Sequence, residues 1–93
     1  MFCVICFDIS DDRSRYRVVK ELKAVAVRVQ KSVFECPDLK EKRFLKLKRK
    51  LEKYIDSPED SIRYYFLCQG CIPRVEYSGC GGEPIIDEGF KII

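Results

Sequence analysis

Three segments of the chain carry the hydrophobic pattern of strands. Phe2 to Phe7 is a continuous apolar run that stops at Asp8, and a short run rich in Val, Ile and Phe is typical of a strand buried on both faces. Val27 to Cys36 is β-rich but is interrupted at Lys31 and Ser32. This interruption predicts either two short strands joined by a tight turn or one bulged strand. Ser61 to Cys68 predicts another strand.

Two further segments have the period of helices. Apolar residues on one helical face predict a first helix from about Asp12 to Val25, which Ser10 or Asp11 can cap. A second helix is expected to open at Pro37-Asp38 and to break at Ser57-Pro58. The apolar stripe of the first helix comprises Val18, Val19, Leu22 and Val25, and that of the second comprises Phe44, Leu47, Leu51 and Tyr54.

The order β-α-β-β-α-β predicts an α+β, ferredoxin-like sandwich. In this fold two helices cover one face of an antiparallel sheet, and the first strand lies near the centre of that sheet. Pro73 to Ser78 is a candidate for a further short strand. An apolar tail, from about residue 79 to residue 93, needs a surface to cover, and we expect it to pack on the sheet edge of a partner chain. Residues 1–93 are expected to form one domain.

Length and composition narrow the class of protein. A chain of 93 residues has a thin core, because domains of this size bury only about 60% of their unfolded surface, and oligomerisation is one way to compensate. The content of 46% hydrophobic and 35% charged residues is typical of a soluble globular domain. The N-terminus has no basic region and no long apolar stretch. We therefore expect no signal peptide, no membrane span and a cytoplasmic location.

Positive charge is clustered along the chain. The net charge is only +3, but six basic residues between Arg13 and Arg28 stand against a single acid, Glu21, and the second helix is also strongly basic. Such clusters favour a surface for a polyanion, on which Lys and Arg follow phosphates without reading sequence. A merely solvated helix face has the same pattern, and charge alone leaves both interpretations open.

The chain contains no histidine, which excludes Ser-His-Asp and Cys-His catalysis. Asp8 stands out instead, because a carboxylate that ends a buried strand needs a metal, an arginine or backbone N–H groups as partner. Arg15 lies on the helical line of Val18 and is within reach. Asp8 is therefore either a metal ligand or a structural residue that caps the helix or pairs with Arg15.

Magnesium suits a site with so few carboxylates, because it accepts one or two of them together with waters and phosphate oxygens. A two-fold dimer would bring two copies of Asp8 to one axis. A metal held there can activate water for phosphodiester cleavage.

The six cysteines fall into two groups. Cys3, Cys6 and Cys36 lie in apolar runs and are expected to be small buried residues. Cys68 and Cys71 form a Cys-X-X-Cys pair, and Cys80 follows. A four-cysteine zinc site is disfavoured because a second pair is missing. A redox pair is disfavoured further, because the motif stands at a strand end.

Several motifs resemble those of the CRISPR-associated protein 2 family, in order and over nearly the whole chain. Phe7 to Asp12 resembles the first motif, in which an apolar strand and Asp-Ile lead into an arginine-rich helix start, here Arg13, Arg15 and Arg17. Arg28 to Cys36 resembles the second motif, Arg-(Val/Ile)-Gln-x-Ser-Val-Phe. Ser61 to Tyr65 with the following Cys-x-x-Cys resembles the family's fourth strand and its edge.

The resemblance implies a homodimer whose C-terminal strand packs across the dimer. Members are described as metal-dependent nucleases and as bridges between dimers of the CRISPR integrase, CRISPR-associated protein 1, during spacer acquisition. By position, Asp8 would be the catalytic residue and the ligand of Mg²⁺ or another divalent metal. The nucleic-acid contacts would be Arg13, Arg15, Arg17, Arg28 and Lys31, the last standing where many relatives have an aromatic residue. Phe7, Ser32 and Phe34 would form the pocket.

Two functions from different classes remain. The first is a slow magnesium-dependent endonuclease that hydrolyses RNA and possibly also DNA. The second is a non-catalytic dimer that binds duplex DNA on its basic helices and joins integrase dimers through its C-terminal tails. Asp8 is needed only by the first. A remote third, an RNA-recognition module, lacks the exposed aromatic pairs expected on its first and third strands.

Overall fold

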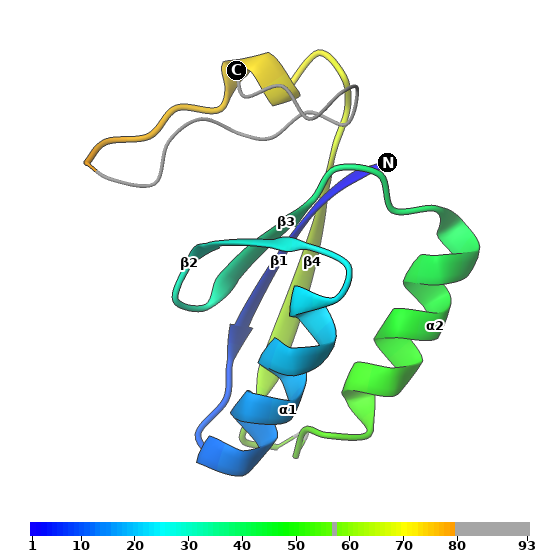
Figure 1. Ribbon diagram of the computed structural model, residues 1–93, viewed down its shortest axis with the longest axis vertical. Coiled ribbons are helices and arrows are strands. Elements are labelled where there is room, and N and C mark those ends of the chain that lie inside the picture. Colours follow the sequence, from blue (N-terminus) through cyan, green and yellow to red (C-terminus); the bar gives the residue numbers. More distant parts are fainter. Residues whose placement is uncertain (57, 80–93) are drawn as a thin grey trace.

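A computed structural model describes residues 1–56 and 58–79 of the chain (Figure 1). Strand β1 (Phe2–Asp8) lies inside a sheet of order β2-β3-β1-β4 and is antiparallel to β3 (Val33–Cys36) and β4 (Ser61–Leu67). The predicted ferredoxin-like α+β arrangement and the central position of the first strand are confirmed.

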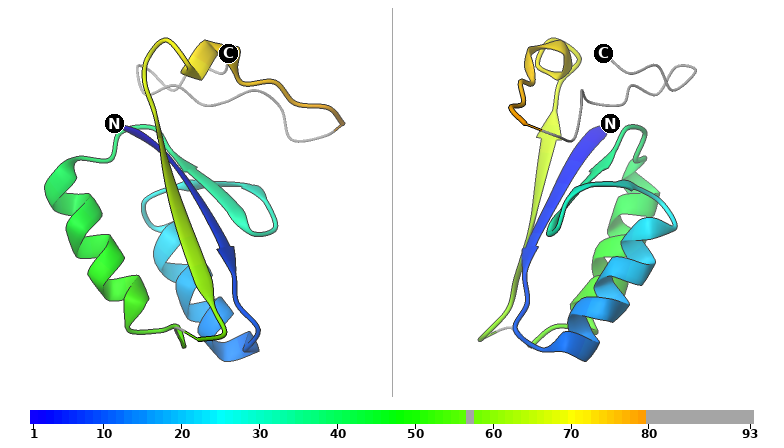
Figure 2. Two further views of the ribbon diagram at one scale, coloured as in Figure 1. Left: turned by 180° about the vertical axis from the view of Figure 1, so that it is seen from behind. Right: turned by 60° about the vertical axis from the view of Figure 1, so that its left-hand side comes forward.

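Helices α1 (Asp12–Lys23) and α2 (Glu41–Glu52) cover one face of the sheet (Figures 1 and 2). Their predicted apolar stripes pack on alternate residues of β1, and burial of each large apolar side chain stabilises the fold by about 1.5–3 kcal/mol. This packing holds the end of β1, where the chain leaves the sheet, in a defined position. The core includes Cys3, Ile5, Phe7, Val18, Leu22, Phe34, Leu47 and Leu51.

The hairpin that follows α1 contains both features that the sequence left open. β2 (Val27–Gln30) and β3 are two separate strands, and their pairing shifts between Arg28 and Gln30 as in a β-bulge. The shift bends the hairpin and places the turn at Lys31 and Ser32 beside the end of β1.

The predicted start of α1 is confirmed, but α1 ends at Lys23, two residues before the expected Val25, and the start of α2 also differs from the prediction. Asp11 is the N-cap of α1, and its carboxylate accepts the N–H of Ser14 at 2.8 Å. α2 begins at Glu41, three residues later than Asp38. The helix begins later because Leu39 is buried and donates its N–H to the carbonyl of Met1 at 2.8 Å, which holds this segment outside the helix.

The predicted strand from Pro73 to Ser78 is wrong. The chain forms a short 3₁₀-helix, η1 (Ile72–Arg74), and continues irregularly to Gly79. Proline has no N–H for a sheet and its fixed φ suits the first turn of a helix. The N–H groups of Arg74 and Val75 are used locally, on the carbonyls of Cys71 and Ile72.

The predicted C-terminal strand and its packing on a partner fall on residues 80–93, outside the described residues. The turn predicted from Gly79 to Gly82 is described only at Gly79, which has a φ of 86°. Among the described residues, neither helix is long and apolar enough to cross a membrane.

Candidate active site and nucleic-acid interface

Asp8 is the last residue of β1 and is exposed, although both of its neighbours belong to the core. Phe7 is 6% exposed and Ile9 is 4% exposed. The N–H of Phe7 donates to the carbonyl of Ser32 at 3.1 Å, which brings the β2–β3 turn against the end of β1. The carboxylate of Asp8 is therefore presented to solvent between two residues that are packed into the core.

A groove of about 690 Å³ opens beside Asp8. One wall comes from α1 and the other from the β2–β3 hairpin. Five basic side chains and two carboxylates line it, so its field is positive and attracts phosphates. The basic residues are Arg15, Lys20, Lys23, Arg28 and Lys31, and the acids are Asp8 and Asp12.

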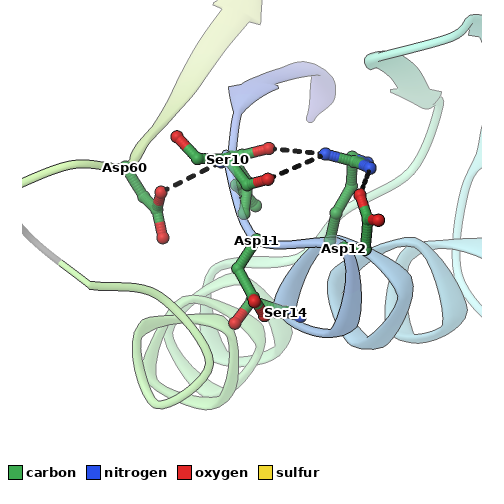
Figure 3. Close-up of polar contacts among 7 residues, drawn as sticks. Ser10, Asp11, Asp12, Ser14 and Asp60 are labelled. Carbon is green, nitrogen blue, oxygen red and sulfur yellow. Dashed lines mark hydrogen bonds and ion pairs between the residues drawn. The ribbon is translucent and has the colours of Figure 1, made fainter.

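Arg15 is anchored where the chain passes from β1 into α1. Its guanidinium donates to the carbonyl of Ile9 at 2.8 Å and pairs with Asp12. Figure 3 shows the surrounding contacts, in which Asp11 receives the N–H of Ser14 and Asp60 receives that of Ser10 at 3.3 Å. These contacts tie the start of α1 to the loop before β4.

The same contacts bear on the two structural roles considered for Asp8. Asp11 caps the helix, and the Ser14 N–H that it accepts lowers the pKa of its carboxyl. Arg15 forms its ion pair with Asp12. In the part of the chain that the structure describes, both roles are thus filled by other residues, and Asp8 faces the groove.

Arg28 is held across the β2–β3 turn. Its Nε and one terminal nitrogen donate to the carbonyl of Lys31 at 3.1 and 2.7 Å. The guanidinium also lies 5.7 Å from the centre of the Phe34 ring, in a cation–π contact. Arg28 is therefore oriented in advance, with guanidinium N–H groups left over for a ligand.

The groove contains only part of the predicted site. Asp8, Arg15, Arg28, Lys31 and Ser32 line it. Phe7 and Phe34 are core residues with ring centres 6.2 Å apart, so they support the groove from within the core.

Two predicted nucleic-acid contacts lie outside the groove lining. Arg13 is exposed on α1, and the guanidinium of Arg17 is 5.9 Å from the ring centre of Tyr54. Their assignment to nucleic-acid binding stays a prediction.

Sequence reasoning missed the contribution of α1 to this wall. Tyr16, Lys20 and Lys23 line the groove, and Tyr16 is 66% exposed. A signal was present, because these residues follow Asp12 at intervals of four, four and three, which places them on one helical face. The charge of the segment is evident from the sequence, whereas the hairpin that faces this side of the helix is known only from the fold.

The basic residues of α2 lie elsewhere. Lys50 pairs with Glu21 of α1 at 2.8 Å, a contact that raises the pKa of Lys50, and Lys48 pairs with Glu52 at 3.1 Å. Others, including Lys42, Arg43, Lys46 and Arg49, are exposed. This helix is a second basic surface, separate from the groove lining.

Comparison with known proteins identifies the family. The family model of CRISPR associated protein Cas2 matches residues 1–75. CRISPR-associated endoribonuclease Cas2 1 of Chloroflexus aurantiacus is 38% identical over 94 aligned positions that cover all of both chains. The crystal structure of Streptococcus pyogenes Cas2 matches with a TM-score of 0.77 and 32% identity, covering 85% of this chain and 100% of that one. A chain of a partial Cas6-RT-Cas1–Cas2 complex matches with a TM-score of 0.72 and 30% identity, covering 82% of each. The chain therefore belongs to the CRISPR-associated protein Cas2 family.

Proposed function

We propose that this protein is a divalent-metal-dependent endoribonuclease of a CRISPR system, with Asp8 as its catalytic carboxylate. The observation that carries the proposal is the exposed position of Asp8 on a groove with five basic side chains. A phosphodiester bound by these cations would lie beside the carboxylate. RNA as the substrate is supported by the word endoribonuclease in the name of the Chloroflexus aurantiacus relative.

The carboxylates described near Asp8 in one chain are few for a metal site. Within residues 1–56 and 58–79, no three His, Cys, Asp or Glu side chains gather closely enough to hold an ion. Magnesium fits such a site, because it usually keeps several waters and binds through one or two carboxylates and substrate phosphates. We therefore place Asp8 of two chains near the axis of a homodimer. When bound, the metal would neutralise phosphate charge and make a bound water more acidic.

The groove residues would bind and orient the strand. Arg28, already fixed on the Lys31 carbonyl, would offer its other N–H groups to phosphate oxygens. Lys20 and Lys23 would contact neighbouring phosphates without reading sequence. The exposed ring of Tyr16 would stack on an unpaired base, which favours single strands over duplexes.

Proton transfer has few candidates at this site. The carboxylate of Asp8 can accept a hydrogen bond from the attacking water and hold it in line with the phosphorus. With no histidine in the chain, the leaving oxygen takes its proton from solvent or from a groove lysine. A positioned general acid or base commonly raises the reaction rate by about 10²–10⁴-fold. Because this site has no histidine to act as the general acid, we expect a slow enzyme.

Cleavage assays with Asp8→Asn test the proposal. Labelled single-stranded RNA and duplex DNA are incubated with Mg²⁺ or with EDTA, and Glu59→Gln, an exposed carboxylate outside the groove lining, is the matched control. We expect Mg²⁺-dependent cutting of RNA that Asp8→Asn lowers by about 10²–10⁴-fold and Glu59→Gln leaves unchanged. Equal cutting by Asp8→Asn, or no cutting by the wild type, would refute it.

A mixing experiment tests whether two Asp8 carboxylates share one site. Wild-type and Asp8→Asn chains are unfolded together in equal amounts and refolded, so that they pair at random. If both carboxylates are needed, activity falls to about one quarter of the all-wild-type value, because only that share of dimers carries two wild-type chains. A fall to about one half would mean that each chain acts alone.

A DNA-binding bridge is the second candidate, and separate observations favour it. A similar chain occurs in the solved partial Cas6-RT-Cas1–Cas2 complex, and α2 exposes cations away from the groove. We propose that Cas1 is a partner and that α2 contacts duplex DNA. If Asp8→Asn abolishes cleavage but leaves spacer acquisition with Cas1 intact, the bridge is the biological role. Loss of both would make cleavage necessary.

A further inference from the structure

Cys68 and Cys71 form an exposed pair that the nuclease site does not use. Their Sγ atoms lie 3.3 Å apart. The N–H of Cys71 donates to the carbonyl of Cys68 at 2.9 Å, and this i to i+3 hydrogen bond closes a turn in which the Cα atoms are within about 7 Å. Disulfides span Cα separations of about 4.4–6.8 Å. The turn therefore holds the two thiols where a disulfide can form with little backbone movement.

The pair lies at the end of the sheet opposite Asp8. In the register of β1 and β4, Asp8 is paired with Ser61 and Phe2 with Leu67, so Cys68 follows β4 at the far end (Figure 1). A seven-residue strand spans about 20 Å. A change at the thiols is thus separated from the groove by the length of the sheet.

The other described cysteines have a different environment. Cys3 is fully buried, and burial raises the pKa of its thiol to about 12. Burial likewise raises the pKa values of Cys6 and Cys36. Attack on a disulfide requires a thiolate and access to solvent, so these three are expected to be inert in the folded chain.

Within the pair the two thiols are not equivalent. Hydrogen bonding with the Cys71 thiol, followed by the backbone N–H groups of Cys71 and Gly70, stabilises the Cys68 thiolate and lowers the pKa of Cys68, while the same contact raises the pKa of Cys71. Cys68 is therefore suited to attack first, and Cys71 to resolve the resulting intermediate.

We propose that Cys68 and Cys71 are a reversible redox site, which small disulfides of the glutathione type convert into an intramolecular disulfide. Cys68 loses its proton to solvent and attacks one sulfur of the small disulfide. A mixed disulfide forms, the original S–S bond breaks, and the leaving thiolate takes up a proton. Cys71, deprotonated in turn, attacks the Cys68 sulfur and releases the second small thiol. Two cysteine thiols are oxidised, and one small disulfide is reduced to two thiols.

The structure removes the reason for which the sequence disfavours a redox pair, namely the position of the motif at a strand end. In the structure, β4 ends at Leu67 and the pair occupies its own turn before η1. The geometry of the turn, rather than the strand, determines how the thiols meet.

Peptide mass spectrometry tests the redox site directly. The full-length protein is equilibrated in glutathione buffers of increasing oxidised fraction, free thiols are alkylated, and the chain is cut with trypsin. The peptide from Tyr64 to Arg74 contains Cys68 and Cys71 and no other cysteine. We expect it to lose two hydrogen atoms and both alkylation sites together, and dithiothreitol to restore them.

Single variants separate the roles of the two thiols. Cys71→Ser should trap glutathione on Cys68, whereas Cys68→Ser should gain several-fold less adduct on Cys71. Circular dichroism of each variant checks that it is folded. The proposal would be overturned if both Cys68 and Cys71 remained open to alkylation in fully oxidised buffer. A disulfide from either thiol to Cys80 instead would also overturn it.

Discussion

The two ends of the sheet carry opposite kinds of chemistry. The end at Asp8 presents carboxylate oxygens among cations, a combination that suits phosphates and hard metal ions. The end at Cys68 presents two soft sulfur atoms that can exchange electrons. β1 and β4 are antiparallel neighbours. The C-terminal end of β1, at Asp8, and the C-terminal end of β4, before Cys68, therefore lie at opposite ends of the sheet. One small sheet can therefore hold two sites that do not interfere.

The ends also differ in what holds them. Around Asp8 local contacts are joined by long-range ones, since the N–H of Ser10 donates to Asp60 and the N–H of Phe7 donates to the carbonyl of Ser32. Around Cys68 the contacts are local, since the backbone hydrogen bonds of this turn join residues three or four apart. The first site depends on the whole fold, and the second depends mainly on one turn. This difference can be tested at each end.

The largest expected effect is the separation of the two activities. Asp8→Asn should lower RNA cleavage by about 10²–10⁴-fold and leave the glutathione titration of the Tyr64–Arg74 peptide unchanged. The double variant Cys68→Ser, Cys71→Ser should do the reverse. Both variants are measured in both assays. If the cysteine variant changes cleavage as strongly as Asp8→Asn, the two ends are coupled and the comparison fails.

The second effect concerns the cations of the groove. Lys20→Ala or Lys23→Ala should weaken binding of single-stranded RNA several-fold and reduce the slope of log affinity against log salt by about 0.7, because one phosphate contact is lost. Lys46→Ala, an equal loss of charge on the exposed face of α2, is the control. Fluorescence anisotropy at several salt concentrations measures both quantities. If Lys46→Ala weakens RNA binding equally, the affinity depends on the total positive charge and not on the position of the lysine in the groove.

The third effect concerns the pH dependence of the thiols. A lowered pKa means more thiolate at a given pH, so alkylation of Cys68 should reach half its maximal rate below the ordinary thiol value of about 8.5. Cys71, whose pKa is raised, should do so above it. At about pH 7 we expect Cys68 to be alkylated several-fold faster. Time-resolved alkylation with mass spectrometry measures the rates, and identical profiles would contradict the assigned roles.

The smallest effect concerns the cap of α1 at the Asp8 end. The pKa of Asp11 is depressed in the folded chain, so its charge stabilises the fold above the unfolded value of about 3.9, and this stabilisation is lost as pH falls through the folded pKa. Asp11→Asn keeps an oxygen acceptor, so its melting temperature should lie slightly below that of the wild type at neutral pH and converge with it in acid. Asp11→Ala should be lower at every pH. Thermal unfolding from about pH 7 to about pH 2 tests this.

Much of the fold could be predicted from local pattern. The apolar run that ends at Asp8, the cap at Asp11 and the stripe through Leu47 and Leu51 each depend on residues close in sequence. Their physical causes, burial of an apolar face and satisfaction of helix-end N–H groups, act locally. The failure at Pro73 to Ser78 has the opposite cause, because a strand also needs a hydrogen-bonding neighbour that pattern cannot supply.

The sequence by itself therefore determined the four strands and two α-helices up to Leu67, the basic character of the chain and the position of Asp8 at a strand end. Only the tertiary structure decided which cations share a groove with Asp8, because that groove forms where α1 and the β2–β3 hairpin meet across the sheet end. Arg28 and Lys23 are brought together there, whereas Arg17 lies against Tyr54. The order of charged residues along the chain does not show which of them lie together in space, because this depends on packing between elements that are far apart in sequence.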